Sequence, residues 1–114
     1  MRKIDKPWGY ELIWAETKDY VAKVIFIAPG HRLSKQYHEE KEETVYVLEG
    51  TLVNTDKDDK ETWLSPGQSF HVTPGQVHRF CAPANGHVKI VEVSTPHLDD
   101  VVRLEDDYRR IGPE

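Results

Sequence analysis

The stretch Gly30–Gly50, GHRLSKQYHEEKEETVYVLEG, decides the fold. Side chains alternate in character through its first half, which predicts a β-strand over Arg32–His38. Alternation groups four polar side chains on one face of this strand: Arg32, Ser34, Gln36 and His38. After a short acidic stretch, Glu43 begins a second strand, with Val45 and Val47 in phase with it. The stretch therefore predicts two strands that carry an amide, an imidazole and a carboxylate.

Short alternating runs rich in β-branched and aromatic residues continue along the whole chain. We expect nine strands: Tyr10–Trp14, Tyr20–Ile27, Arg32–His38, Glu43–Leu48, Thr51–Asn54, Glu61–Leu64, Ser69–Val72, Val77–Cys81 and His87–Val93. Turn dipeptides separate them, among them Pro66-Gly67, Pro74-Gly75 and Asn85-Gly86. Helical periodicity is confined to a weak turn within residues 99–110. The pattern predicts an all-β sandwich or barrel.

The composition limits the size and the partners of the protein. A chain of 114 residues corresponds to a single domain, residues 1–114. A net charge of −5 with 31% charged residues predicts a soluble protein that binds neither nucleic acid nor an anionic membrane. Cys81 is the only cysteine, which excludes an intramolecular disulfide. Because the first residues lack a signal-peptide core, we expect the protein in the cytoplasm.

Four residues form a candidate metal site: Gln36, His38, Glu43 and His78. His78 follows the Pro74-Gly75 turn, far along the chain from the other three. If the four converge inside a barrel, they supply two imidazoles, one carboxylate and one amide oxygen. Such a mixed nitrogen and oxygen set suits one divalent ion of the first transition row, and we expect Zn, Mn, Fe, Co or Ni.

The spacing of these residues resembles the cupin family. In the first motif, Gly30 precedes Gln36-Tyr37-His38, Glu43 follows and Gly50 closes it. The second motif runs from Gly67 through Thr73-Pro74-Gly75 to His78. The departures are Gln36, Thr73 and Ala82, which stand where the family usually has His, Pro and Asn. The resemblance implies a single-domain jelly-roll barrel, also called a double-stranded β-helix, and a metal on Gln36, His38, Glu43 and His78.

Within the cupins, residues 6–110 resemble the type II phosphomannose isomerases. The likeness is carried by Lys6-Pro7-Trp8-Gly9, by the segment around Gln36, by His78-Arg79-Phe80 and by residues 99–108. It implies a metal-dependent isomerase that interconverts mannose 6-phosphate and fructose 6-phosphate in polysaccharide or nucleotide-sugar precursor synthesis. The family's domain is often fused behind a nucleotidyltransferase. This sequence has no Gly-rich nucleotide loop, so we expect no nucleotide transfer from it.

Two arginines are candidates for contact with the substrate. Arg32 shares the predicted face of the metal ligands, and its guanidinium suits a phosphate. Arg103 matches an arginine of the family's C-terminal signature, which implies a catalytic as well as a substrate-binding role; a surface salt bridge is the alternative. Arg79 alternates away from His78, which favours a structural role. No residue is assigned as the general base.

Other functions and a further partner follow from the same residues. Two histidines and a carboxylate also resemble the ligands of non-haem iron oxygenases, so a cupin dioxygenase or epimerase stays open. A non-catalytic sugar- or metal-binding module is a third hypothesis. Oxygen consumption would separate an oxygenase from an isomerase. The aromatic stretch Trp8–Trp14, together with family habit, predicts a homodimer.

Overall fold

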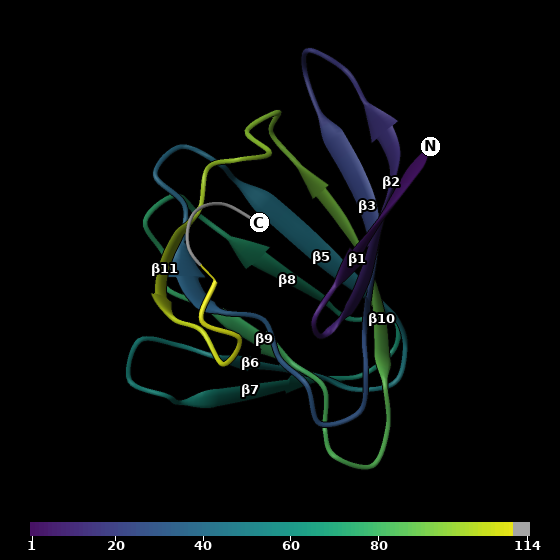
Figure 1. Ribbon diagram of the computed structural model, residues 1–114, viewed down its shortest axis with the longest axis vertical. Helices are drawn as coiled ribbons and strands as arrows, with labels where there is room; N and C mark the ends of the chain where they lie inside the picture. Colours follow the sequence, from purple (N-terminus) through teal and green to yellow (C-terminus); the bar gives the residue numbers. More distant parts are fainter. Residues whose placement is uncertain (111–114) are drawn as a thin grey trace.

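The computed structural model describes residues 1–110, and within them it contains strands and no helix (Figure 1). The eleven strands are β1 (Arg2–Lys6), β2 (Gly9–Glu16), β3 (Val21–Ile27), β4 (Lys35–Tyr37), β5 (Glu43–Glu49), β6 (Leu52–Thr55), β7 (Glu61–Leu64), β8 (Ser69–Val72), β9 (Arg79–Cys81), β10 (Val88–Ser94) and β11 (Val102–Glu105). Among the described residues there is accordingly no helix long and apolar enough to span a membrane.

The strands form one large sheet faced by two small ones. The large sheet has the order β1-β2-β3-β10-β5-β8, and every pairing in it is antiparallel. Opposite it lie the three-stranded sheet β7-β6-β9 and the two-stranded sheet β11-β4 (Figure 1). Neighbours in each sheet are often distant in sequence, as β3, β10 and β5 are. This arrangement is the predicted jelly-roll barrel.

All nine predicted strands overlap a strand of the structure, and two strands were not predicted. The weak helical turn predicted within residues 99–110 is wrong, because Val102–Glu105 is strand β11, paired with β4. The other missed strand, β1, lies at the edge of the large sheet. Both strands are largely exposed or half-buried, so neither carries the alternation that marks a strand with one buried face.

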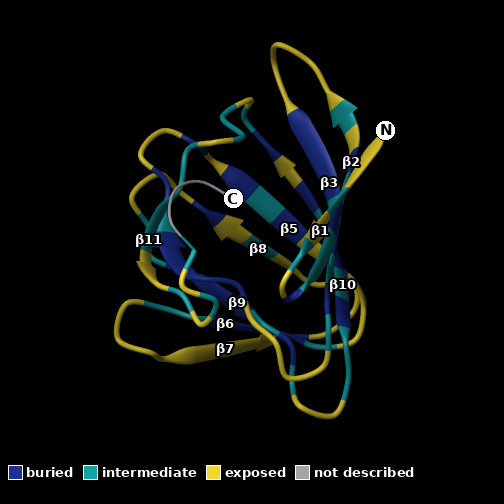
Figure 2. Ribbon diagram, viewed as in Figure 1, coloured by how far each residue is buried: buried dark blue, intermediate teal, exposed yellow. Residues whose placement is uncertain are grey.

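The hydrophobic core lies between the large sheet and the small ones (Figure 2). It draws on the inward positions of the central strands, which recur at every second residue as period-two alternation requires. Its fully buried members include Trp8, Ile27, Val45, Val47, Leu52, Val72, Phe80, Val88 and Ile90. Burial of these side chains fixes the register of the central strands, and with it the direction in which the site residues point.

Gly50 shows why a glycine closes the first motif. Its φ is +79°, in the left-handed region, and it connects β5 to β6. A Cβ atom at this position would lie 2.1 Å from the carbonyl oxygen of His87. Any side chain here would therefore displace the backbone at His87, directly before the start of β10.

A one-residue bulge near the start of β4 changes which side chains face the barrel interior. Arg32 opposes Cys81 and Gln36 opposes His78. The chain therefore advances four residues from Arg32 to Gln36 while its partner advances three from His78 to Cys81. On a regular strand Arg32 and Gln36 would lie on the same face, but the extra residue puts their side chains on opposite faces. Leu33 consequently faces the interior together with Gln36, and the predicted placement of Arg32 on the ligand face is wrong.

Candidate metal centre

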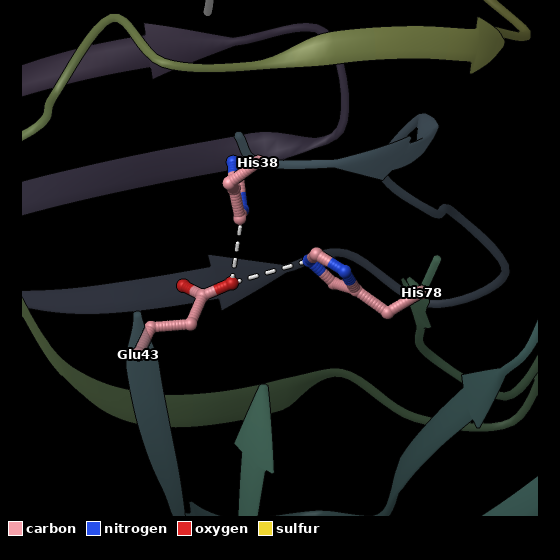
Figure 3. Close-up of side chains that lie close together, drawn as sticks. All are labelled: His38, Glu43 and His78. Carbon is pink, nitrogen blue, oxygen red and sulfur yellow. Dashed lines mark hydrogen bonds and ion pairs between the residues drawn. The ribbon is translucent and has the colours of Figure 1, made fainter. Parts of the chain in front are cut away.

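Three predicted ligands meet in the barrel interior (Figure 3). His38 directly follows β4, Glu43 is the first residue of β5, and His78 directly precedes β9. Oε1 of Glu43 lies 3.1 Å from Nε2 of His38 and 3.1 Å from Nε2 of His78. All three side chains are at most 5% exposed. The atoms that would bind a metal lie within 4.8 Å of one another.

Backbone carbonyl groups orient both imidazoles. Nδ1 of His38 is 2.5 Å from the carbonyl oxygen of Asp100, and Nδ1 of His78 is 3.0 Å from that of Gln76. A carbonyl oxygen can only accept, so both rings carry their proton on Nδ1. The lone pair on each Nε2 therefore points into the cluster, which is the arrangement of metal-binding histidines.

Gln36, the fourth predicted ligand, lines the same pocket. Its backbone pairs with that of His78 through two hydrogen bonds of 3.0 and 2.9 Å. Its side-chain oxygen Oε1 is enclosed and accepts no hydrogen bond from residues 1–110. Since a buried amide oxygen is normally paired, an oxygen of this kind beside two imidazoles and a carboxylate fits a bound cation.

Asp100 holds the loop that joins His38 to Glu43. Its carboxylate accepts hydrogen bonds from the backbone amides of Glu39, Glu40 and Lys41 at 3.0, 2.7 and 2.8 Å. Its carbonyl oxygen is the one that orients His38. One residue from the C-terminal part of the chain therefore fixes both the loop and a ligand. This role of Asp100 was not predicted from the sequence, because the contact joins positions 60 residues apart.

Lys41 and Glu92 lie directly behind Glu43 and were also missed. Nζ of Lys41 is 3.6 Å from Oε2 of Glu43 and 3.3 Å from Oε2 of Glu92. Burial opposes the charge of Glu43, but a hydrogen bond from the Glu92 carboxyl and the charge of Lys41 hold its pKa well below the usual value. Burial and the Glu43 charge raise the pKa of Glu92 to about 8. Glu43 is thus kept as an anion, the form that binds metal.

A sequence signal for Glu92 did exist. Val88, Ile90 and Glu92 occupy alternate, buried positions of β10, so a carboxylate stands where the pattern calls for an apolar residue. Lys23 breaks the pattern of β3 in the same way, in phase with Ile25. A charged residue in the inward phase of a central strand indicates a polar site inside the barrel.

Of the three arginines considered in the sequence, only Arg32 lies on another face than predicted. Arg32 makes two hydrogen bonds to Asp107, at 2.7 and 3.0 Å, and does not line the pocket. Arg79 is buried, as its structural role requires, and binds the carbonyl oxygen of Leu33 and the carboxylate of Asp107. Arg103 pairs with Gln36 across β4 and β11, and its guanidinium is enclosed. It is not among the residues that line the pocket.

A β-barrel with an inward cluster of two histidines and a glutamate defines the protein as a cupin. Solved structures agree on this fold: KdgF from a Halomonas species superposes with a TM-score of 0.75 at 22% identity, covering 84% of this chain and 88% of that one. A family model described as "Mannose-6-phosphate isomerase C-terminal" matches residues 1–106. The chain belongs to that family.

Two curated relatives are named as polysaccharide biosynthesis proteins. The alginate biosynthesis protein AlgA of Pseudomonas aeruginosa is 35% identical over 112 residues, which is 95% of this chain and 23% of AlgA. The xanthan biosynthesis protein XanB of Xanthomonas campestris is 34% identical over 113 residues, 96% of this chain and 24% of XanB. The chain thus spans about a quarter of the length of these relatives.

Proposed function

We propose that this domain is a divalent-metal-dependent isomerase that interconverts mannose 6-phosphate and fructose 6-phosphate. The metal would be held by Gln36, His38, Glu43 and His78. The observation that carries the proposal is the buried cluster of two Nε2 atoms and one carboxylate oxygen in a pocket of the barrel. Membership in the mannose-6-phosphate isomerase C-terminal family supports the choice of substrate.

The reaction moves a proton between C1 and C2 of the sugar through an enediolate. A bound divalent ion would supply stabilisation of the negative charge that develops on the sugar oxygens. Four residues of the chain would hold that ion, while Lys41 and Asp100 keep Glu43 and His38 in place. The apolar lining from Ile13, Ile25 and Leu98 would exclude water around the sugar.

The test is a coupled assay of the metal-loaded protein against a panel of hexose and pentose phosphates, run in parallel with an oxygen electrode. We expect turnover of mannose 6-phosphate without oxygen uptake, and loss of both metal and turnover in His38→Ala. Oxygen uptake that depends on the same ligands would favour a dioxygenase. Full metal occupancy with no turnover of any sugar would favour a binding module.

We also propose that the domain forms a homodimer through the outer face of the large sheet. Tyr46, Leu48 and Val93 are 48%, 43% and 49% exposed on neighbouring strands of that face. Such a group of large apolar side chains is typical of an interaction surface. Light scattering should give twice the mass of the chain, and Tyr46→Glu should halve it; a monomeric wild type at high micromolar concentration would refute the proposal.

A further inference from the structure

A chain of alternating acidic and basic side chains runs from the metal cluster into the wall of the barrel. We call this set the charge ladder; its members are Glu43, Lys41, Glu92, Lys23, Glu11 and Lys6. Successive partners are 2.6–3.9 Å apart, and every side chain in the ladder is at most 9% exposed. Six ionisable side chains in the interior of so small a domain are unusual, because charges are buried only at a large desolvation penalty.

The ladder occupies positions that the fold would otherwise fill with core residues. Lys23 opposes Glu92 in the pairing of β3 with β10, two residues along from the pair Ile25 and Ile90, so both pairs have the same inward phase. Glu11 opposes Ile25 on the other side of β3. Apolar residues at such positions would complete the core without desolvating charge. The charges are therefore better explained by what the pocket binds than by stability.

The ladder has two parts that differ in what they contact. Lys41 and Glu92 touch Glu43 and so belong to the metal centre. Lys23 and Glu11 follow Glu92 in the ladder. Nζ of Lys23 donates a hydrogen bond of 2.6 Å to Oε1 of Glu11. Both line the pocket that the metal ligands line, but neither has an ion pair with a ligand among the described residues.

From this geometry we infer that Glu11 and Lys23 form a sugar-hydroxyl subsite, which binds neighbouring hydroxyl groups of the hexose while the metal ligands hold its reacting end. The inference rests on the proposed function and names the part of the substrate this wall recognises. An ammonium donates and a carboxylate accepts, so the pair matches two adjacent hydroxyls, each of which does both. Their formal charges cancel, which makes the pair a poor site for a phosphate dianion and a good one for a neutral diol.

The test measures binding of mannose 6-phosphate to the metal-loaded protein by calorimetry, separately from turnover. Glu11→Gln should weaken binding by about 10- to 100-fold, the range for losing a hydrogen bond to a charged group. The metal affinity should stay within about twofold of the wild type. Glu49→Gln is the matched control, because Glu49 pairs with Lys89 on the surface. It should change neither quantity.

Binding of deoxy sugar phosphates shows whether Glu11 recognises a sugar hydroxyl or has only a structural role. Removing the hydroxyl that the subsite binds should weaken binding to the wild type but not further weaken binding to Glu11→Gln. If Glu11→Gln does not fold, the charge-neutral pair Glu11→Gln with Lys23→Gln answers the same question. Unchanged sugar affinity and an unchanged deoxy-sugar pattern would overturn the subsite while leaving the isomerase intact. A wild type that neither binds nor converts any sugar phosphate would overturn both proposals.

Discussion

Two groups of buried or half-buried charged side chains lie on either side of β4, and they differ in the part of the molecule that they contact. Inside the barrel, the charge ladder reaches the metal ligands through Lys41 and Glu43. On the other side, Arg32 and Arg79 both bind Asp107, and we call these three residues the outer clamp. Every member of the ladder except Lys6 lines the pocket, whereas no member of the outer clamp does. The charged lining of the pocket comes from the ladder together with Arg2 and Asp99, whereas Arg32 and Arg79 tie the C-terminal segment to the barrel wall.

The difference traces to the bulge between Arg32 and Gln36. Without the extra residue, Arg32 would share the face of Gln36 and belong to the pocket. With it, Arg32 shares the face of Cys81 and meets Asp107. A single inserted residue therefore decides whether a guanidinium faces the pocket or the C-terminal segment. If the two clusters are independent, a variant that perturbs one should leave the other unchanged.

The largest effect is expected from His38→Ala. This change removes one of three clustered ligand groups, so the affinity for Zn or Mn should fall by more than about 100-fold, beyond the range seen when only a supporting residue is lost. The outer clamp should stay intact. Competition with a chromogenic chelator measures the change, with His71→Ala, a histidine outside the pocket, as the control. Equal affinities for the two variants would mean that His38 is not a ligand.

The next effect belongs to the outer clamp. Arg79→Ala leaves the carbonyl oxygen of Leu33 without its side-chain partner and removes one of the two hydrogen bonds to Oδ1 of Asp107, which Arg32 still binds. Leaving the carbonyl oxygen unsatisfied should lower the free energy of unfolding by about 1–3 kcal/mol, measured by urea denaturation. The metal affinity should change by less than about threefold, because neither group touches a ligand. A loss of metal as large as that in His38→Ala would show that the two clusters are not independent.

Sequence patterns predicted this fold well where strands have one buried face. β3, β5 and β10 alternate clearly, and their predicted bounds differ from those in the structure by one residue. β1 and β11 escaped because neither buries a full face. The order of strands in the large sheet depends on long-range pairing, and it entered only through the resemblance to cupins.

The candidate site was predictable to the extent that its residues lie in local motifs. His38, Glu43 and His78 stand at motif positions, and the structure brings them together; their role as ligands stays a prediction. Arg32 was misplaced because nothing in a single sequence marks a bulge within an already mixed strand. Asp100 was missed because its partners are defined only by the folded chain.

A smaller effect, again on the metal, is expected from Asp100→Ala. The change removes the acceptor for three backbone amides of the loop between His38 and Glu43. The metal affinity should fall by about 10- to 100-fold, the range for losing a group that orients a ligand. Asp100→Asn, which keeps an acceptor oxygen, should recover part of it. If Asp107→Ala, which breaks the outer clamp, weakened metal binding as much, the loop contacts would have no special part in it.

The smallest effect is expected from Arg32→Ala, and its pH dependence tells what Arg32 does. The side chains of Arg32 and Asp107 are 46% and 42% exposed, so their ion pair should contribute only about 0–1 kcal/mol at neutral pH. The hydrogen bond from Arg32 lowers the pKa of Asp107. A carboxyl whose pKa is lower in the folded state stabilises the fold above its unfolded value, near pH 4, and this contribution disappears as the pH falls through the folded pKa. The difference in unfolding free energy between wild type and Arg32→Ala should therefore shrink below about pH 4, while the KM for mannose 6-phosphate stays unchanged at neutral pH. A rise in KM of about tenfold or more without a change in stability would place Arg32 against the substrate, and the assignment that follows from the bulge would then be wrong.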